Sequence, residues 1–580
     1  MQNLLLTLGH DSSAATIAPD GTMTAIQEER VSGVKGDSSF PKGAIHALET
    51  CGSINYDEPV ALYITHWFND FTISALMATK YYDAEWMNKR FKAIHWRGMP
   101  SETFTHHDAH MFSANHYFKS NHNDFGQRMR TTTIVMDGFG NHGEMLSVYQ
   151  GEHRIFRSHA LRYSLGLFFQ YATSYTNMKE NQDEYKYAGY ASKIRDIGLS
   201  NEQFTNLVME ANTTAKNYAE NIVIHREKDV SVSSISDSKY GVNVTYLESI
   251  RTSIHQHLDN VMANCVSKTE SWSITDTRTI IGWYSQLMLE TTVKKLIKDV
   301  GYVYSSDALI FTGGIFQNVE LNKCLFHDPD YSEMKMCFTP LCGDIGNSIG
   351  AFTKEYKQGP FPILKSNLAH IPRPALSSQT RKKLRTQEPL VAMLPKDTAE
   401  YDNIAANLIT ETLKANGIVN IVGPNMEFGP RSLCQTATIA FPTIENVERI
   451  NQANQRNTIM PMAPVMTREM FHSLVNEGDP LNRSVGSHQH MICSYKVDRQ
   501  TYEKIPGACH VHADGTFSIR PQVTNDPIML RVLACVSNKY PALINTSFNF
   551  HGDPIPYTHD QALAAHRKQG GKFITVFLEN

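Results

Sequence analysis

The sequence has no long apolar run and no large excess of either charge. Its 580 residues include 54 Lys and Arg against 58 Asp and Glu, so the formal net charge is 54 − 58 = −4. This near-neutral balance excludes a general electrostatic attraction to nucleic acid but leaves a local basic face open. No stretch approaches the roughly 18 apolar residues that a membrane span requires, and the first residues do not resemble a signal peptide. We therefore expect a soluble, cytoplasmic protein with no membrane partner.

Cysteine is scarce, and its spacing disfavours a disulfide scaffold. The nine cysteines are odd in number, and no two of them form a Cys-x-x-Cys pair. A reducing compartment is therefore favoured. Hydrophobic residues make up 41% and charged residues 19% of the chain, which excludes disorder, collagen and coiled coil as the dominant class. At roughly 150 residues per domain, the length predicts about four folding units or two large ones.

The sequence does contain short apolar strands that end in glycine and polar residues. Leu4–Leu8 runs into Gly-His-Asp-Ser, Thr131–Met136 into Asp-Gly, and Ala308–Thr312 into Gly-Gly, while Met23–Gln27 is a further strand candidate. An apolar stripe of helical period over Thr279–Val300 predicts a long helix. This mixture predicts an α/β fold, in which ligands bind at the carboxyl edge of the sheet.

A change of composition near residue 370 predicts two domains. Residues 366–386 are rich in Pro, Ser and basic residues, as inter-domain linkers are. We therefore expect one domain over residues 1–370 and a second over residues 371–580. The second contains further predicted strands and a helix, at Ile418–Val422, Met491–Tyr495, Pro541–Asn545 and His559–Lys568.

Residues 106–110, with the sequence HHDAH, predict a metal site. On a helix, His106 and His110 stand one turn apart on the same face, where two imidazoles can reach one ion. At least one more ligand is needed, and Asp137 and Asp344 are the candidates because both stand beside glycine in predicted turns. A mixed imidazole and carboxylate set suits iron, zinc or manganese better than calcium. The alternative is a helix start that carries surface histidines.

The glycine turns of the first domain also indicate a nucleotide site. Gly138 and the pair Gly313 and Gly314 follow strands, where backbone N–H groups can approach a phosphate, and Asn318 follows the second turn. Many strands end in glycine for steric reasons alone, so each turn by itself is weak evidence. Together with the carboxylate of Asp137 they indicate a cleft for a nucleotide and a metal.

Two motifs of the second domain suit phosphate or carboxylate recognition. Arg431 follows a Gly-Pro turn, and a guanidinium binds such planar anions through two parallel hydrogen bonds. Ser547 and Asn549 alternate with Phe548, so in an extended segment both polar side chains face one way. A buried Arg–Glu pair and an ordinary polar turn are the structural alternatives, and spacing does not decide between them.

The order of the motifs along the chain carries a family resemblance. In sequence they are GHDSSAA at 9–15, EER at 28–30, FP at 40–41, HHDAH at 106–110, DG at 137–138, EYK at 184–186, GG at 313–314, EFGPR at 427–431 and NTSFN at 545–549. The chain resembles the O-carbamoyltransferases of antibiotic and nodulation-factor biosynthesis (the NodU/CmcH family) over nearly its whole length. The last two motifs are specific to that family.

The resemblance implies a fold and a reaction. The first domain would be an actin-like (ASKHA) pair of α/β lobes, as in threonylcarbamoyl transferases acting on tRNA, and the second a YrdC-like α/β domain. In the family, carbamoyl phosphate and ATP give carbamoyl-adenylate and pyrophosphate in the second domain. The mixed anhydride passes to the first domain, where an acceptor hydroxyl attacks the carbamoyl carbon and AMP leaves.

The resemblance also assigns roles to residues. A divalent metal, Fe²⁺ with Mn²⁺ or Zn²⁺ as alternatives, would be held by His106, His110, Asp137 and Asp344, and Mg²⁺ would accompany ATP. His10, with Asp11 beside it, would be the general base, a role that suits a neutral imidazole near pH 7. The donor would be bound by Gly138, Gly313, Gly314, Asn318, Arg431, Arg456, Ser547 and Asn549.

Three positions depart from the family pattern and remove positive charge from the expected donor site. The family usually has a lysine and two arginines where this chain has Asn454, Met460 and His551. Either adenylation is altered, or neighbouring arginines compensate, the candidates being Arg431, Arg449 and Arg483. We expect compensation, because other donor-site residues remain, namely Arg431, Arg456, Ser547 and Asn549.

The acceptor stays open at this point. The leading hypothesis is a hydroxyl of a small natural product or sugar. A second is the hydroxymethyl group of 5-hydroxymethylcytosine in DNA or nucleotides, because Lys80–Arg97 interleaves basic and aromatic residues; the same stretch also fits an amphipathic helix with a solvated basic side. A third hypothesis is a nucleotide-binding protein without catalysis. The expected partners are carbamoyl phosphate, ATP and the acceptor, and a homodimer is also open.

Overall fold

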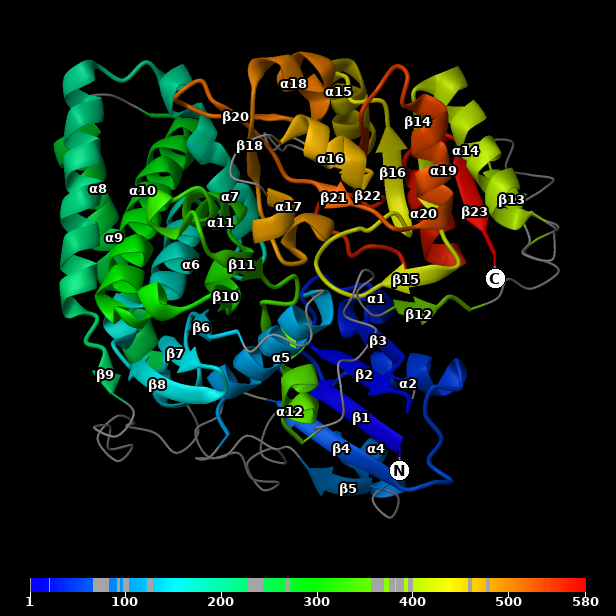
Figure 1. Cartoon of the computed structure of the whole chain (residues 1–580), viewed down its shortest axis with the longest axis horizontal. Helices are drawn as coiled ribbons and strands as arrows, with labels where there is room; N and C mark the ends of the chain where they lie inside the picture. Colours follow the sequence, from blue (N-terminus) through cyan, green and yellow to red (C-terminus); the bar gives the residue numbers. More distant parts are fainter. Residues whose placement is uncertain are drawn as a thin grey trace.

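The computed structural model describes most of the chain. The described residues are 2–19, 21–65, 83–90, 94–97, 104–122, 129–226, 244–266, 272–355, 370–374, 381, 391–394, 400–456, 462–475 and 480–579. Two neighbouring α/β lobes come from the first part of the chain, and a further α/β unit from the last part packs against them (Figure 1).

The first lobe is built on a five-stranded sheet with the strand order β3-β2-β1-β4-β5. Strands β1, β2 and β3 pair antiparallel, whereas β4 and β5 continue the sheet from β1 in parallel. Leu4, Leu5 and Leu6 of β1 are all fully buried, as expected for a central strand covered on both faces. The elements of this lobe are β1 (Gln2–Thr7), β2 (Ser13–Ile17), β3 (Met23–Gln27), α1 (Glu28–Ser32), α2 (Lys42–Thr50), β4 (Val60–Thr65), α4 (Ala84–Arg90) and β5 (Ile94–Arg97).

The second lobe repeats this topology. Its sheet has the order β11-β10-β6-β7-β8-β9, with β6, β7 and β8 antiparallel and β10 and β11 parallel to β6. Counted from β6, the strand order and directions match those counted from β1, with β9 added at the edge. The strands are β6 (Thr131–Met136), β7 (Leu146–Gln150), β8 (His153–Ser158), β9 (His225–Arg226), β10 (Ala308–Thr312) and β11 (Lys335–Phe338). The repeat confirms the prediction of an α/β fold whose first part has two lobes.

Helices α5 (His106–Asn121) and α12 (Asn347–Glu355) connect the two lobes. They pack against each other, and α5 contacts β6 and β10 of the second sheet while α12 contacts β1 and β4 of the first. Figure 1 shows this pair at the junction of the lobes, with the long helices α8 to α10 beyond the second sheet. The remaining helices of the second lobe are α6 (Leu165–Tyr175), α7 (Glu184–Tyr190), α8 (Asn201–Asn221), α9 (Val244–Val261), α10 (Ile274–Val300) and α11 (Val319–Phe326).

The last part of the chain forms a seven-stranded mixed sheet with the order β13-β23-β14-β16-β22-β17-β21. Its strands are β13 (Val391–Leu394), β14 (Ile418–Val422), β16 (Thr436–Ala440), β17 (Ala463–Met466), β21 (Gln522–Val523), β22 (Leu543–Ser547) and β23 (Thr575–Leu578). A small sheet adds β18 (Tyr495–Val497), β20 (Phe517–Ile519) and β19 (His510–Val511). The helices are α14 (Tyr401–Asn416), α15 (Ile444–Ala453), α16 (Arg468–Leu474), α17 (Pro480–Arg483), α18 (Arg499–Lys504), α19 (Pro527–Val536) and α20 (His559–Lys568). The YrdC-like assignment and the boundary at residue 370 stay predictions.

The structure adds a strand to the predicted linker and corrects one predicted strand. The predicted linker contains a strand, β12 (His370–Pro372), which pairs with β15 (Asn425–Glu427). Arg373, directly after it, is buried and donates hydrogen bonds to the carbonyl oxygens of Gly423 and Pro556. The predicted strand Met491–Tyr495 is mostly a buried turn, with a left-handed φ of +58° at Met491. Apolar residues in a buried turn and in a strand look alike in sequence.

Buried polar contacts fix the last part of the chain against the lobes. Arg30 of α1 donates a 2.9 Å hydrogen bond to the carbonyl oxygen of Gly429, and its own carbonyl oxygen accepts one from Gln561. On the other lobe, the hydroxyl of Tyr117 in α5 hydrogen-bonds to the carbonyl oxygen of Gly486 (3.1 Å) and to Nδ1 of His490 (2.9 Å). Helix α5 is therefore held at its far end by a loop more than 360 residues away in sequence.

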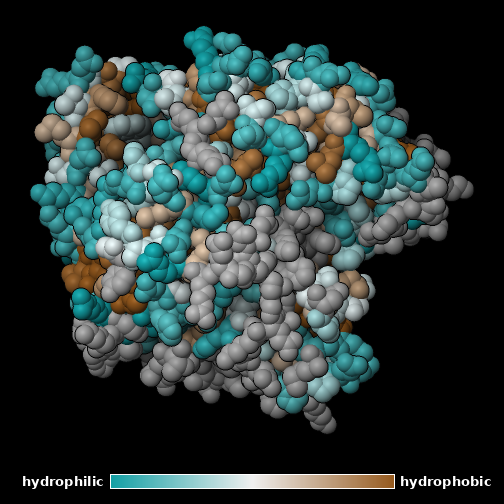
Figure 2. All heavy atoms as spheres, in the orientation of Figure 1, coloured by the Kyte–Doolittle hydropathy of each residue, from teal (hydrophilic) through white to brown (hydrophobic). Residues whose placement is uncertain are grey.

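Hydrophilic residues cover most of the described area on the face drawn in Figure 2, and apolar residues are scattered there in small groups. Among the described residues, none of the helices is both long and apolar enough to cross a membrane.

We expect Tyr117→Phe to loosen the end of α5. The change removes one hydroxyl that donates a hydrogen bond to the carbonyl oxygen of Gly486 and shares a second with Nδ1 of His490, which costs about 1–2 kcal/mol of local stability. Amide hydrogen exchange in α5 and around residues 486–490 should therefore become roughly five- to thirty-fold faster. Tyr246→Phe, at a side chain that is 46% exposed, is the matched control. Unchanged exchange in Tyr117→Phe would show that the hydroxyl does not hold the loop.

Candidate active site

Helix α5 begins where its sequence provides a cap. The Thr105 side chain accepts a hydrogen bond from the backbone N–H of Asp108, and the Asp108 carboxylate accepts one from the N–H of Thr105. This reciprocal capping box fixes the first turn of the helix. His106 and His110 lie one turn apart on the same helix face, as the spacing predicts, and both contact Asp137 at the end of β6.

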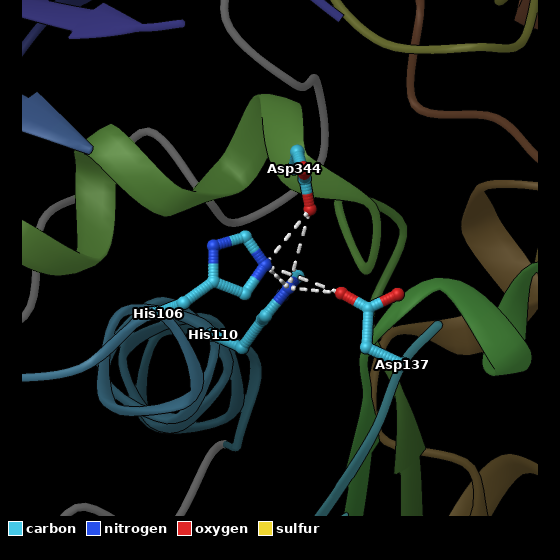
Figure 3. A group of neighbouring side chains, drawn as sticks. All are labelled: His106, His110, Asp137 and Asp344. Atoms are coloured by element: carbon cyan, nitrogen blue, oxygen red, sulfur yellow. Dashed lines mark hydrogen bonds and ion pairs between the residues drawn. The ribbon is translucent and has the colours of Figure 1, made fainter. Parts of the chain in front are cut away.

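Four side chains from three segments converge at this point (Figure 3). Nε2 of His106 lies 3.2 Å from Oδ2 of Asp137 and 3.2 Å from Oδ1 of Asp344. Nε2 of His110 lies 3.2 Å and 3.4 Å from the same two oxygen atoms and 3.3 Å from Nε2 of His106. The structure thus brings together all four residues that the sequence analysis nominated as metal ligands.

The separations between these donor atoms fit one shared ion. Zn–N and Zn–O bonds of about 2.0–2.1 Å place neighbouring ligands of a tetrahedral ion about 3.3–3.4 Å apart. The five measured separations run from 3.2 to 3.4 Å. Two imidazoles and two carboxylates are also a donor set that iron, zinc and manganese accept. The residues therefore fit a divalent transition metal.

The glycine turns hold Asp137 in place. Its second oxygen, Oδ1, accepts hydrogen bonds from the backbone N–H groups of Gly138 (2.7 Å) and Gly314 (3.3 Å). Gly313 has a φ of +97°, and a Cβ there would collide with the carbonyl oxygen of Met136. Asn318 caps α11 by accepting from the N–H groups of Glu320 and Leu321. A nucleotide-binding role for these turns stays a prediction.

The negative charges of Asp137 and Asp344 are balanced by a protonated histidine of the same cluster. Burial by itself lowers the pKa of His106, but the carboxylates of Asp344 and Asp137 outweigh burial and raise that pKa to about 10. The same pairing overcomes burial at both carboxylates and lowers their pKa values. His107 faces away toward Ser147, and burial lowers its pKa to about 3. A divalent cation would take over the role that a protonated His106 plays in balancing two carboxylates.

Asn347 is a member of this group that the sequence analysis missed. Its amide nitrogen lies 3.2 Å from Nε2 of His110 and 3.4 Å from Nε2 of His106, and its oxygen is buried without a partner among the described residues. The signal was present, because Asn347 follows Asp344 by three residues at the start of α12.

His10 stands next to the cluster and is open to solvent. Its Nδ1 lies 3.7 Å from Oδ2 of Asp344, and its Nε2 lies 3.4 Å from Oδ2 of Asp11. Asp344 therefore contacts His106 and His110 with Oδ1 and His10 with Oδ2. The imidazole side chain is 48% exposed, so an acceptor can reach it. Although the side chain is about half exposed, the protein atoms around it desolvate the ring and lower the pKa of His10; the carboxylates of Asp11 and Asp344 outweigh this effect and raise the pKa.

A second group of polar side chains lies where α7 meets the last part of the chain. Arg456 donates hydrogen bonds to Thr546, Ser547 and Asn549, so it shapes the NTSFN segment. Arg431 and Arg520 have no hydrogen bond or ion pair with any described residue, and Nε of Arg431 is buried. Burial lowers the pKa of Arg431, Arg456 and Arg520, and Tyr185 of α7 interacts electrostatically with all three.

The three departures from the family pattern have different surroundings. Asn454 is buried, and its oxygen accepts a hydrogen bond from Gln569. His551 Nε2 lies 3.1 Å from Nζ of Lys186, so a cation from α7 stands beside it. Met460 lies outside the described residues.

Of the arginines expected to compensate, Arg431 joins the second group and the other two do not. Arg449 donates to the carbonyl oxygen of Asn416, and Arg483 donates to those of Phe326 and Tyr331. Arg520 takes the place that was expected of Arg449 and Arg483, because it interacts electrostatically with Arg431. No sequence motif had pointed to Arg520. A guanidinium without partners in a partly buried position is suited to bind an anion.

Comparison with known proteins identifies the family. A model described as "Carbamoyltransferase N-terminus" matches residues 61–353, and one described as "Carbamoyltransferase C-terminus" matches residues 410–577. The chain belongs to the carbamoyltransferase family. The first match contains the converging histidines and aspartates, and the second contains Arg431, Arg456 and Arg520.

Relatives of similar length occur in distant organisms. An uncharacterized protein of Methanocaldococcus jannaschii is 23% identical over 97% of this chain and 95% of its own. An uncharacterized protein of Synechocystis is 22% identical over 95% of this chain and 92% of its own. Among solved structures, a ROK family protein from Streptococcus pneumoniae in complex with sucrose is 12% identical, covers 61% of this chain and 97% of its own, and has a TM-score of 0.22. At this TM-score the likeness supports no conclusion.

We expect His110→Ala to lose one equivalent of bound transition metal. Removing one of four converging ligands leaves two carboxylates facing an incomplete site, which weakens ion binding. Metal bound per chain, after loading with Fe²⁺ or Zn²⁺ and removal of free ion, measures the effect. His46→Ala, at a side chain that is 78% exposed, should retain the wild-type amount. Equal metal in His110→Ala and wild type would contradict binding at this cluster.

Proposed function

We propose that this carbamoyltransferase is ATP-dependent and transfers the carbamoyl group to a hydroxyl. Atom balance sets the first half-reaction: water releases phosphate from carbamoyl phosphate, and an oxygen of the resulting carbamate attacks the α-phosphorus of ATP. Pyrophosphate leaves and carbamoyl-adenylate forms. In the second half-reaction the acceptor oxygen attacks the carbamoyl carbon, the bond to AMP breaks, and the hydroxyl proton goes to a base.

The observation that carries the first half-reaction is the pair of unpartnered guanidiniums, Arg431 and Arg520. ATP and carbamoyl phosphate both bring phosphate groups, which guanidiniums bind through charge-assisted, often paired hydrogen bonds. Arg456 is already bonded to Ser547 and Asn549, so it positions that segment beside them. Lys186, whose ammonium also pairs with Asp183, lies beside His551. This arrangement supports compensation for the missing basic residues.

The surroundings of His10 support the second half-reaction. In its neutral form the exposed imidazole can accept the hydroxyl proton, and the carboxylates of Asp11 and Asp344, 3.4 Å and 3.7 Å from its ring nitrogens, stabilise the imidazolium that then forms. His106, His110, Asp137 and Asp344 would hold the metal, which when bound supplies positive charge to the phosphate of the leaving AMP. Arg431 interacts electrostatically with Cys342, two residues before Asp344, which supports a short path between the proposed donor-side and transfer-side groups.

A small-molecule acceptor is favoured over DNA by the described part of Lys80–Arg97. Trp86 is buried against Phe40 and Tyr56, and Arg90 pairs with Glu49. These side chains pack inside the protein, so they are not available to stack on nucleic-acid bases or to bind phosphates. Tyr81, Tyr82, Phe91 and Lys92 lie outside the described residues, so carbamoylation of 5-hydroxymethylcytosine remains the second candidate.

The donor half-reaction can be measured without an acceptor. With carbamoyl phosphate, ATP and Mg²⁺, we expect the wild type to release pyrophosphate and to form carbamoyl-adenylate, detected by mass spectrometry. Arg520→Met should slow pyrophosphate release roughly 10- to 100-fold, because a charge-assisted hydrogen bond contributes about 1.5–3 kcal/mol. Arg499→Met, at a side chain that is 82% exposed, is the control. Pyrophosphate release that Arg520→Met leaves unchanged would remove Arg520 from the donor site.

The two half-reactions should separate in His10→Ala. Carbamoyl transfer to an accepted hydroxyl should fall by about 10²- to 10⁴-fold, as expected when a general base is lost. Pyrophosphate release without acceptor should stay at the wild-type rate, because His10 lies on the transfer side. Loss of both activities in a folded variant would mean that the half-reactions are not divided between the two parts of the chain as proposed.

A further inference from the structure

A second group of potential metal ligands lies between α11 and the small sheet. Glu320, His510 and His512 each offer a donor atom, and these atoms lie within 4.8 Å of one another. His510 and His512 are two residues apart at β19, so their side chains point to the same face, and their ring centroids are 4.3 Å apart. Oε2 of Glu320 lies 3.6 Å from Nδ1 of His512, close to the spacing between ligands of one zinc ion.

A cation already occupies this group. Lys323 follows Glu320 by one turn of α11, and its Nζ lies 2.6 Å from Oε2 of Glu320 and 2.9 Å from Nε2 of His512. The ammonium also lies 3.3 Å from Nδ1 of His512, the ring nitrogen that faces Glu320 and that a metal would use, while Nε2 also lies 2.8 Å from the hydroxyl of Ser518. Because an ammonium ends a long flexible side chain, Lys323 can withdraw from the position and leave the same donors to a metal ion.

The third donor, His510, has no hydrogen-bond partner for its ring. Within the described part of the chain, neither of its imidazole nitrogens is bonded, although the residue lines a small cavity with Glu320, Ser518 and Arg520. The cavity holds about 20 Å³, which is room for a single water or ion. An unpartnered imidazole beside a carboxylate and a second imidazole is therefore available to a cation.

We propose that Glu320, His510 and His512 bind a divalent transition metal, preferably Zn²⁺, in place of the Lys323 ammonium. Two imidazoles and one carboxylate, with a fourth position open, are a ligand set typical of zinc, and imidazole donors disfavour magnesium and calcium. Glu320 comes from the second lobe and the histidines from the last part of the chain, so the ion ties the two together. The site is separate from the His106 cluster and does not rest on the proposed function.

Zinc counting on the full-length protein tests the site. After removal of metals with a chelator and reloading with Zn²⁺, wild type should carry one equivalent more than His512→Ala or Glu320→Gln. His46→Ala should match the wild type. The difference between the proteins is the readout, so the test does not depend on whether the His106 cluster also takes zinc. Equal zinc in wild type and in a folded His512→Ala variant overturns the proposal.

Lys323→Met provides an independent test, because it removes the competitor and leaves all three ligands. The variant should bind the additional equivalent at least tenfold more tightly than wild type, measured by competition with a chromophoric chelator. Lys119→Met, at an exposed lysine paired with Glu152, should bind zinc as the wild type does. Zinc should also raise the thermal midpoint of Lys323→Met more than that of wild type. An unchanged or weaker zinc affinity in Lys323→Met would mean that Lys323 completes the group and that no metal replaces it.

Discussion

Asp137 and Asp344 place two negative charges beside the imidazoles of His106 and His110 at a buried point where α5 meets the strand ends. Buried charges cost several kcal/mol each unless they are compensated with good geometry. The chain meets this constraint with local devices: a capping box starts α5, and backbone N–H groups of Gly138 and Gly314 hold Asp137. Helix α5 packs against α12, which begins three residues after Asp344, so the contact that joins the two lobes also brings these groups together.

Positively charged side chains gather where the lobes meet the last part of the chain. Arg431 and Arg520 stand there without partners among the described residues, whereas Arg30 and Arg373 are bonded to carbonyl oxygens and hold segments together. A cation bonded to backbone is structural, but one left unpartnered is available to an anion. This contrast distinguishes the arginines that support the fold from those offered to phosphate groups.

Local sequence was sufficient for the fold class and for several elements. The predicted bounds of Met23–Gln27, Thr131–Met136, Ala308–Thr312 and His559–Lys568 agree with the structure, because period and turn residues are local signals. Met491–Tyr495 is not the predicted strand, and the segment predicted as a linker contains the strand His370–Pro372. In both segments, burial by distant parts of the chain decides the conformation, and no local pattern reports that burial.

The sequence by itself was sufficient to select His106, His110, Asp137 and Asp344 as candidate metal ligands. Histidines one turn apart on a helix share a face, and carboxylates that follow strands lie at the edge of the sheet. Only the tertiary structure decided which arginines are free, since Arg449 and Arg483 find carbonyl oxygens that Arg520 does not. The same holds for Glu320, which meets His510 and His512 across some 190 residues of sequence. Such groups depend on how separate segments pack, and packing is a property of the whole chain.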